Sequence, residues 1–254
     1  MLKRLYYFGF SYKCICCNAR LRTYVEVGQD SPAIDNYFII GAGKRKSCCP
    51  ICISYDRDRL MYMYLFWHTD ILNFKATNPT KDKTKLLHIA PETQLTNRII
   101  KSAHIEYTAG DKFEPGYTYP SYCVALDITQ LQYQDNHFDW IICNHVLEHI
   151  LEDIQAMSEL FRVLKPGGIA ILNVPISYTI AHTIEDKEIT DPEERLIHFG
   201  QRDHVRVYGI DYFSRLESVG FTTERISPQS LGIDINYHKL NAQEDLFIAR
   251  KKLQ

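Results

Sequence analysis

Long apolar runs are missing from this sequence. No stretch approaches the roughly 18 to 20 apolar residues that a membrane-spanning helix needs, and residues 1–13 lack the apolar segment and small-residue cleavage site of a signal peptide. An excess of one charge is also missing, because the formal net charge is only −2. With 45% hydrophobic and 24% charged residues, the 254-residue chain has the composition of a globular protein. We therefore expect a cytoplasmic protein with one large domain, a small appendage and no membrane partner.

Glycine is missing where a nicotinamide-dependent dehydrogenase would need it. The first strand expected in the main domain, residues 85–90, is followed by Pro91 and Glu92. A dinucleotide-binding enzyme would have a Gly-x-Gly-x-x-Gly fingerprint at this place, because its backbone must approach the pyrophosphate closely. The absence makes a dehydrogenase the least favoured enzyme class.

The cysteines are distributed unevenly. Six of the eight lie between positions 14 and 52, whereas Cys123 and Cys143 fall in apolar, strand-like segments. Such crowding favours metal binding in a reducing compartment over a framework of disulfides.

Two Cys-x-x-Cys pairs predict a structural zinc site. The two-residue gap lets both thiolates of a pair face one point, so two pairs can surround a tetrahedral ion. The expected ligands are Cys14, Cys17, Cys49 and Cys52. Cys16 or Cys48 could replace a paired ligand, and unligated buried cysteines are the alternative. Four thiolates close the coordination shell, so the ion would supply folding energy and not a catalytic water.

Charge is divided unequally along the chain. Residues 1–60 contain ten Lys and Arg against five Asp and Glu, so the remainder has a net charge of −7. The basic residues 44–46, Arg57 and Arg59 could bind RNA or balance the charge of a four-thiolate site. The acidic remainder favours a small-molecule partner over RNA.

The composition changes along the chain predict three segments. Residues 1–53 have short aromatic and β-branched runs between turn residues, which is typical of a loop-rich, zinc-ribbon-like module. Residues 54–83 read as a connecting helix followed by a polar linker. Residues 84–254 alternate between strand and helix patterns, which predicts an α/β domain with a doubly wound, mostly parallel sheet of seven strands. The expected strands are 85–90, 105–108, 122–128, 138–146, 169–174 and a final antiparallel pair, 221–226 and 245–250; the expected helices are 92–102, 152–164 and 208–219.

The residues that follow each expected strand are the candidates for ligand binding, because a doubly wound sheet binds its ligand beyond the carboxyl ends of the strands. After the first strand, Ala90 permits close backbone approach and Glu92 helps to start a helix. Asp111 follows the second strand and is suited to a ribose diol. Asp127 and Ile128 follow the third and are suited to adenine. A lone Asp after a strand is more often a helix cap or a turn former than a ligand, so the order of these residues carries the prediction.

The run DWIICNHVLEHI, together with ELFRVLKPGG, resembles the region of class I S-adenosylmethionine-dependent methyltransferases that follows the cofactor site. The upstream segments LLHIAPE and DIT, and the downstream segment TDPEERLIHFGQRDHVRVYG, resemble a subgroup with an N-terminal zinc ribbon that ends in a CPxCxSxxRxR-like motif. The resemblance spans most of the chain and implies a Rossmann-like methyltransferase fold. It implies that the cofactor S-adenosylmethionine is surrounded by His88, Ala90, Glu92, Asp111, Asp127, Ile128, Asn144 and His145. The chain departs from the pattern where the first loop has no glycine and where Asn18 and Ile53 stand at positions that are often glycine in such ribbons.

Few side chains are suited to assist methyl transfer. The reaction is an in-line displacement, which needs a held acceptor and needs a base only if the acceptor must lose a proton. The polar loop 200–208 contains His204 and Arg206, and we expect His204 to act as general base or to orient the acceptor together with Arg206. His145, which with His149 flanks Glu148, is the third candidate; the alternative is that both histidines start a helix or pack.

The expected acceptor is a small molecule or a glycan-related metabolite with a hydroxyl or carboxylate. One alternative is an RNA methyltransferase that grips RNA with its basic zinc module. Another is a non-catalytic cofactor-binding adaptor, because the first loop is atypical.

Overall fold

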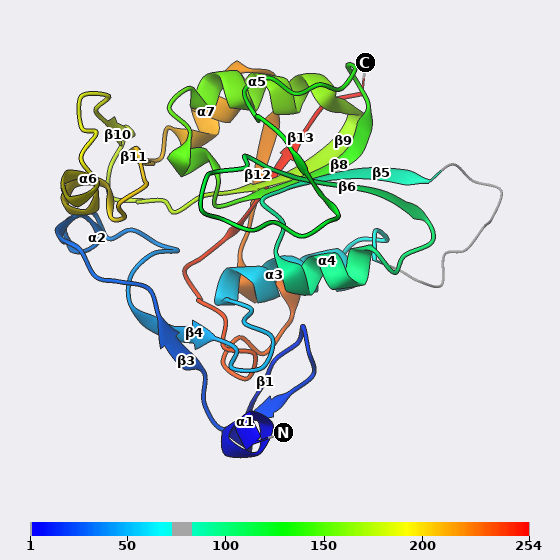
Figure 1. Cartoon of the computed structure of the whole chain (residues 1–254), viewed down its shortest axis with the longest axis vertical. Coiled ribbons are helices and arrows are strands. Elements are labelled where there is room, and N and C mark those ends of the chain that lie inside the picture. Colours follow the sequence, from blue (N-terminus) through cyan, green and yellow to red (C-terminus); the bar gives the residue numbers. More distant parts are fainter. Residues whose placement is uncertain (1, 73–82, 254) are drawn as a thin grey trace.

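A central seven-stranded sheet organises the main domain. The computed structural model describes residues 2–72 and 83–253, and within them the strand order of this sheet is β12-β13-β9-β8-β5-β6-β7 (Figure 1). Strands β5 to β9 are parallel, and β13 is antiparallel to both of its neighbours. The strands are β5 (Thr84–Ile89), β6 (Ile105–Asp111), β7 (Cys123–Ala125), β8 (Phe138–Asn144), β9 (Leu164–Asn173), β12 (Thr222–Ile226) and β13 (Leu246–Arg250). The predicted doubly wound fold, its seven strands and the final antiparallel pair are thus confirmed.

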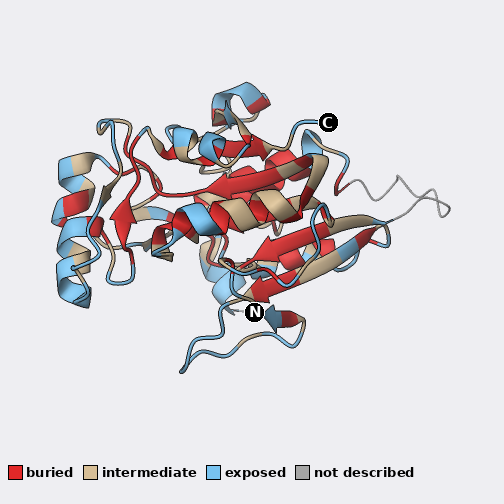
Figure 2. Ribbon diagram, turned by 90° about the horizontal axis from the view of Figure 1, so that it is seen from above, coloured by how far each residue is buried: buried red, intermediate tan, exposed pale blue. Residues whose placement is uncertain are grey.

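Helices cover both faces of the sheet (Figure 1). One face carries α3 (Asp56–Trp67) and α4 (Thr93–Ile99), and the other carries α5 (Asp153–Val163) and α7 (Tyr212–Ser218). Successive residues of a strand point to opposite faces, so Leu86 packs with the α3 side and Leu87 with the α5 side. Figure 2 shows the strands buried between these layers.

Several predicted elements start or end elsewhere. Strand β9 begins at Leu164 and not at the expected 169, β6 runs to Asp111 and not to 108, and α4 is shorter than the expected 92–102. The helix expected at 208–219 begins only at Tyr212, because residues 206–207 form the short strand β11 (Arg206–Val207), which pairs with β10 (Ile184–Glu185). Strand β7 is shorter than the expected 122–128. Cys123 and Cys143 lie in strands, as expected.

Helix α6 (Pro192–Phe199) was not predicted. Asp191 accepts hydrogen bonds from the backbone N–H groups of Glu193 and Glu194, and Pro192 occupies the first turn. This is a strong helix start, and Gly200 ends the helix in a left-handed conformation. The Asp-Pro-Glu-Glu run was therefore the signal that could have revealed it.

The N-terminal region consists of short elements below the sheet in Figure 1. They are α1 (Leu2–Tyr7), β1 (Phe8–Lys13), β2 (Arg20–Leu21), β3 (Val25–Val27), α2 (Pro32–Tyr37) and β4 (Arg45–Cys48); the 3₁₀ helices η1 (Leu147–His149) and η2 (Pro228–Leu231) lie in the main domain. Strands β1 and β2 pair antiparallel, as do β3 and β4.

The division into 1–53, 54–83 and 84–254 stays a prediction. Helix α3, expected as a connector, shares an apolar cluster with β5. The polar linker expected at the end of the second segment lies almost wholly outside the described residues. No helix in the described ranges combines the length and apolar character needed to cross a membrane.

Candidate functional site

The four paired cysteines lie together in the N-terminal region. The Sγ atoms of Cys14 and Cys52 are 3.6 Å apart, those of Cys17 and Cys49 are 3.8 Å apart, and all four lie within 4.8 Å of one another. Thiolates around a tetrahedral zinc, with bonds of about 2.3 Å, are about 3.8 Å apart. The donor set and its spacing fit zinc.

The backbone around each cysteine pair forms a tight turn. The N–H of Cys14 donates to the carbonyl of Ala19, and the N–H of Cys49 donates to that of Ser54. Asn18 and Ile53 have φ values of 58° and 64°, so both adopt the left-handed conformation that glycine would adopt without strain. The two departures from glycine therefore keep the turn geometry.

The other two N-terminal cysteines are not part of this group. Cys16 and Cys48 are buried, and the Cys48 thiol donates to the carbonyl of Cys49. Among the described residues, the cysteine group that could hold an ion consists of the two matched pairs.

A fully buried arginine joins the N-terminal region to the main domain. The Arg59 guanidinium donates to the carbonyls of Ser47 and Ser54 at 2.9 and 2.7 Å, and to those of His238 and Lys239 at 3.0 and 2.6 Å. Its donors are thus used inside the protein, so Arg59 is not available to RNA.

The carboxyl ends of the central strands bring the predicted cofactor residues to one edge of the sheet. Ile89 is in register with Gly110 of β6 and with Cys143 of β8, and Asp111 is in register with Ala125 of β7. The residues that follow these partners therefore lie side by side. Ala90 has a φ of 47°, and its N–H donates to the carbonyl of Gly110.

Three of the predicted cofactor residues bind one another. The His88 ring, which is fully buried, donates from Nε2 to Glu92 (2.7 Å), and its Nδ1 lies within hydrogen-bond distance of the Tyr107 hydroxyl (3.0 Å). Asn144 donates to the other Glu92 oxygen at 2.6 Å. Burial alone would raise the pKa of Glu92, but the contact with His88 lowers it. Both Glu92 oxygens are therefore engaged in fixing the loop that contains Ala90.

The two predicted aspartates differ in their surroundings. Asp111 is half-buried at the end of β6, and this burial raises its pKa. Asp127 is exposed and accepts from both the N–H and the hydroxyl of Thr129 at one oxygen, which lowers its pKa. Ile128 is buried next to it.

A chain of charged groups connects the end of β8 to the N-terminal region. His145, whose side chain is 10% exposed, has Nδ1 3.4 Å from Glu148 and Nε2 3.7 Å from Glu244. Glu244 lies 3.9 Å from Arg45, which binds Asp56 with two hydrogen bonds of 2.7 and 2.9 Å. Burial alone would raise the pKa of Glu148, but His145 beside it lowers this pKa to about 2. Glu148 is therefore a carboxylate at neutral pH.

The two candidates from the 200–208 loop are both buried. His204 has Nδ1 3.3 Å from the carbonyl of Phe199, and burial lowers its pKa to about 4, so the ring is neutral. Arg206 donates to the carbonyls of Leu147, Ile150 and Leu151.

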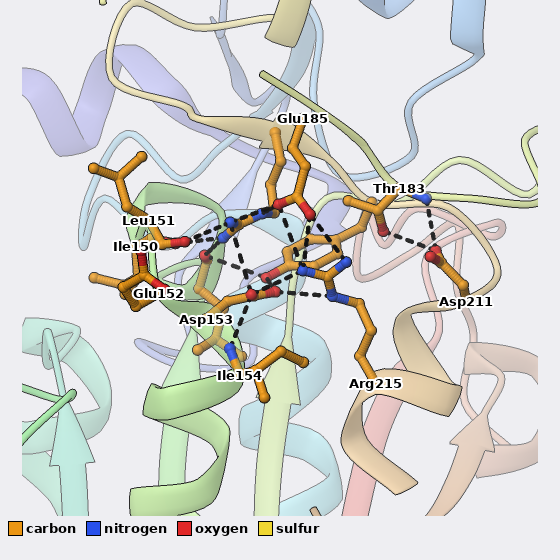
Figure 3. A network of polar contacts seen from close by, with 12 residues as sticks. Ile150, Leu151, Glu152, Asp153, Ile154, Thr183, Glu185, Asp211 and Arg215 are labelled. Atoms are coloured by element: carbon orange, nitrogen blue, oxygen red, sulfur yellow. Dashed lines mark hydrogen bonds and ion pairs between the residues drawn. The ribbon is translucent and has the colours of Figure 1, made fainter. Parts of the chain in front are cut away.

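Arg206 also belongs to a wider ionic network. It contacts Glu185 at 2.8 Å, and Arg215 binds both Glu185 and Asp153. Figure 3 shows Asp153 and Glu185 facing each other, with Arg215 reaching them from α7. The network holds η1 and the start of α5 in place, which is a positioning role.

Two cavities lie along the seam between the N-terminal region and the main domain, and Tyr55 and Arg57 line both. The first, of about 370 Å³, is lined by Val27, Gly28, Gln29, Ile34, Gly41, Ala42, Gly43, Arg45 and Gln201 besides this pair. The second, of about 350 Å³, is lined by Cys52, Ile53, Asp58, Pro91, Glu92, Thr93 and Gln94 besides the pair. The first cavity adjoins the end of β8, because a Cβ on Gly41 would lie 3.2 Å from the His145 ring.

The sequence interpretation assigned Arg57 to RNA or to charge balance, and it overlooked Tyr55 and Glu244. The signal for Arg57 was its place in the motif that begins with the second cysteine pair. Glu244 had no signal, because its partners Arg45 and His145 are far away in the sequence.

Comparisons with known proteins agree with the fold. Residues 95–172, less than half of the chain, match the family model described as a methyltransferase domain. No curated protein sequence matches the chain. The matched residues run from α4 to β9 and include strands β6, β7 and β8 of the central sheet.

Solved structures are similar at low sequence identity. The cyclase SpnF is 16% identical, with a TM-score of 0.45, over 79% of this chain and 83% of that one. The 1,6-didemethyltoxoflavin-N1-methyltransferase of Burkholderia thailandensis is 15% identical, with a TM-score of 0.43, over 78% of each chain. The phosphoethanolamine N-methyltransferase 2 of Haemonchus contortus, in complex with S-adenosyl-L-methionine, is 15% identical, with a TM-score of 0.43, over 78% of this chain and 57% of that one. Such likeness carries no argument about the acceptor.

Proposed function

We propose that the protein transfers the methyl group of S-adenosylmethionine to a small acceptor that bears a carboxylate or phosphate, bound in the first cavity. The observation that carries the proposal is the position of this cavity. It is lined by Gly41, on which a Cβ would lie 3.2 Å from the ring of His145, the residue after β8. It also shares Arg57 with the cavity beside the Pro91–Gln94 loop. An acceptor there would adjoin the edge of the sheet where a doubly wound fold binds its ligand.

The charge of the cavity supports an anionic acceptor. The charged side chains among its lining residues are Arg45 and Arg57. Arg45 is already neutralised by Asp56 through two hydrogen bonds. The Arg57 guanidinium lies over the Tyr55 ring and 3.9 Å from Asp58, and its side chain is 23% exposed. A guanidinium binds planar anions through paired hydrogen bonds, so Arg57 is the residue suited to hold the acceptor. A volume of about 370 Å³ suits a metabolite.

We propose that S-adenosylmethionine binds to residues at the carboxyl ends of four neighbouring strands, β5, β6, β7 and β8. Asp111 would accept from the ribose hydroxyls, Asp127 and Ile128 would meet the adenine, and the backbone at Ala90 would face the amino-acid end. His88, Glu92 and Asn144 would hold this loop through their mutual hydrogen bonds. Bound S-adenosylmethionine supplies the methyl group.

Of the three residues proposed for catalysis, His145 is best supported as one that touches the reactants, because it follows β8 directly and its ring lies next to Gly41, which lines the acceptor cavity. His204 and Arg206, which are almost fully buried, would act through the residues around η1. The four paired cysteines would hold a structural zinc ion, which the 3.6 and 3.8 Å sulfur separations support.

The test is calorimetric titration of the zinc-loaded protein with S-adenosylmethionine and its demethylated product, followed by a methylation screen of carboxylate- and phosphate-bearing metabolites. We expect Arg57→Gln to raise the KM for the acceptor about ten- to hundredfold, the loss of one charged hydrogen-bonded pair, and to leave cofactor affinity unchanged. Arg22→Gln, at an exposed arginine of the N-terminal region, is the matched control.

Three outcomes would contradict the proposal. A folded, zinc-loaded protein that binds no cofactor would refute the cofactor site. Cofactor binding without transfer to any acceptor would favour the adaptor alternative. RNA binding that weakens steeply with salt would favour the RNA alternative, although the engagement of Arg45 and Arg59 inside the protein opposes it.

A further inference from the structure

We propose that Glu148, His149 and His204 bind a divalent transition-metal ion, at a second metal site separate from the four-cysteine group. Two of these residues belong to η1, just beyond the end of β8, and the third belongs to the loop after α6. The inference is independent of the identity of the acceptor.

The three side chains converge on one point. One ligand atom from each lies within 4.8 Å of the other two. The Nε2 atoms of His149 and His204 are 3.9 and 4.0 Å from the same Glu148 oxygen, and the two rings are nearly perpendicular, at 83°. Ligands around a tetrahedral ion with bonds of about 2.1 Å are about 3.4 Å apart. The Glu148 oxygen therefore needs to approach each of the two Nε2 atoms by only about half an ångström.

Both histidines are held in the orientation that a metal requires. Nδ1 of His149 is 3.2 Å from the carbonyl of Asp203, and Nδ1 of His204 is 3.3 Å from the carbonyl of Phe199. A carbonyl can only accept, so each Nδ1 carries the hydrogen and Nε2 is the nitrogen available to bind an ion. In metal-binding histidines, a hydrogen bond from the ring nitrogen that does not bind the metal fixes the tautomer in this way.

Glu148 lacks a hydrogen-bond partner. The residue is 1% exposed, and neither of its oxygens accepts a hydrogen bond from the described part of the chain. Its contacts with the surrounding histidines, 3.4 to 4.0 Å, are longer than hydrogen bonds. A buried carboxylate without a close partner is costly, and a bound cation would satisfy it.

The ligand types define the kind of ion. Two imidazoles and one carboxylate suit zinc, iron and cobalt and differ from the thiolates that would hold structural zinc. Three ligands leave coordination positions open. The His149 side chain is 31% exposed, which gives the ion a path from solvent.

The experiment measures a second ion on the full-length protein. The cysteine group is first loaded with one equivalent of zinc, and Co²⁺ is then titrated, with binding followed by calorimetry and by visible absorption. We expect one further equivalent per chain, without the sulfur-to-cobalt charge-transfer absorption that cysteine ligation would produce. His149→Asn and Glu148→Gln should each weaken this binding at least about tenfold. His198→Asn, at an exposed histidine of α6, should leave it unchanged.

Two outcomes of this experiment would overturn the proposal. If the wild-type protein takes up no ion beyond the first equivalent of zinc, or if His149→Asn binds Co²⁺ as tightly as the wild type, the proposal is wrong. Because Glu148 is buried and its replacement could impair folding, the partly exposed His149 provides the decisive variant, with circular dichroism to verify that it is folded.

Discussion

Replacing Arg59 by methionine tests whether the N-terminal region is fixed to the main domain by a buried guanidinium. Methionine keeps most of the length of the side chain and removes all of its donors. The carbonyls of Ser47, Ser54, His238 and Lys239 would lose a charged partner at distances of 2.6 to 3.0 Å.

The size of the effect follows from this arrangement. A hydrogen bond from a charged group contributes about 1.5 to 3 kcal/mol, but the four share one side chain and some carbonyls would find water. A buried acceptor left without a donor costs about 1 to 3 kcal/mol, so with some of the four carbonyls rehydrated we expect a loss of unfolding free energy of about 3 to 5 kcal/mol. For a chain of this size, that corresponds to a melting temperature lower by about 6 to 20 °C.

The assay is urea and thermal unfolding of the zinc-loaded protein, followed by circular dichroism. Arg57→Met, two residues away on the same helix, is the matched control and should cost about 1 kcal/mol or less, because the partly exposed guanidinium of Arg57 makes a long 3.9 Å ion pair with Asp58 and a cation–π contact with the Tyr55 ring. A loss below about 1 kcal/mol for Arg59→Met would refute the reasoning, since it would mean that the four carbonyls do not depend on the guanidinium.

Two further predictions concern the cysteine group and the start of α3. Cys17→Ser should reduce bound zinc and unfold the N-terminal region, whereas Cys48→Ser, at a buried cysteine outside the group, should retain the ion; metal analysis of both purified variants distinguishes them. Burial, together with the nearby charge of Glu92, raises the pKa of Asp58 to about 6. A carboxyl whose pKa is higher in the folded state favours folding at low pH, so its contribution is lost as pH rises from about 4 to about 6. In denaturant titrations across this interval, Asp58→Asn should make stability depend less on pH, and an unchanged pH dependence would contradict the shift.

Prediction from sequence succeeded best where one segment carries the whole signal. The apolar runs around Leu87 and Ile141 indicated strands, and the structure confirms both. The Asp-Pro-Glu-Glu run at α6 was just as local but was overlooked. The start of the helix at 208–219 was placed too early because residues 206–207 pair with residues 184–185, an interaction that no periodicity within the segment reveals.

The candidate site was predictable only in outline. The order of polar residues after successive strands predicted the edge that would face the cofactor, because parallel strands place their carboxyl ends together. The roles of the individual side chains depended on their partners. His88, Glu92 and Asn144 stand in the sequence as three possible ligand contacts, yet in the structure they bind one another.

The sequence by itself determined the alternation of strands and helices and the two cysteine pairs, because hydrophobic period and Cys-x-x-Cys spacing act over a few neighbouring residues. Only the tertiary structure decided that Arg59 would bind the carbonyls of residues 238 and 239, that Arg45 would face Glu244, and that His204 would meet Glu148. These contacts join groups separated by tens to hundreds of residues. They form only because the sheet and its helices bring both partners to the same end of the fold.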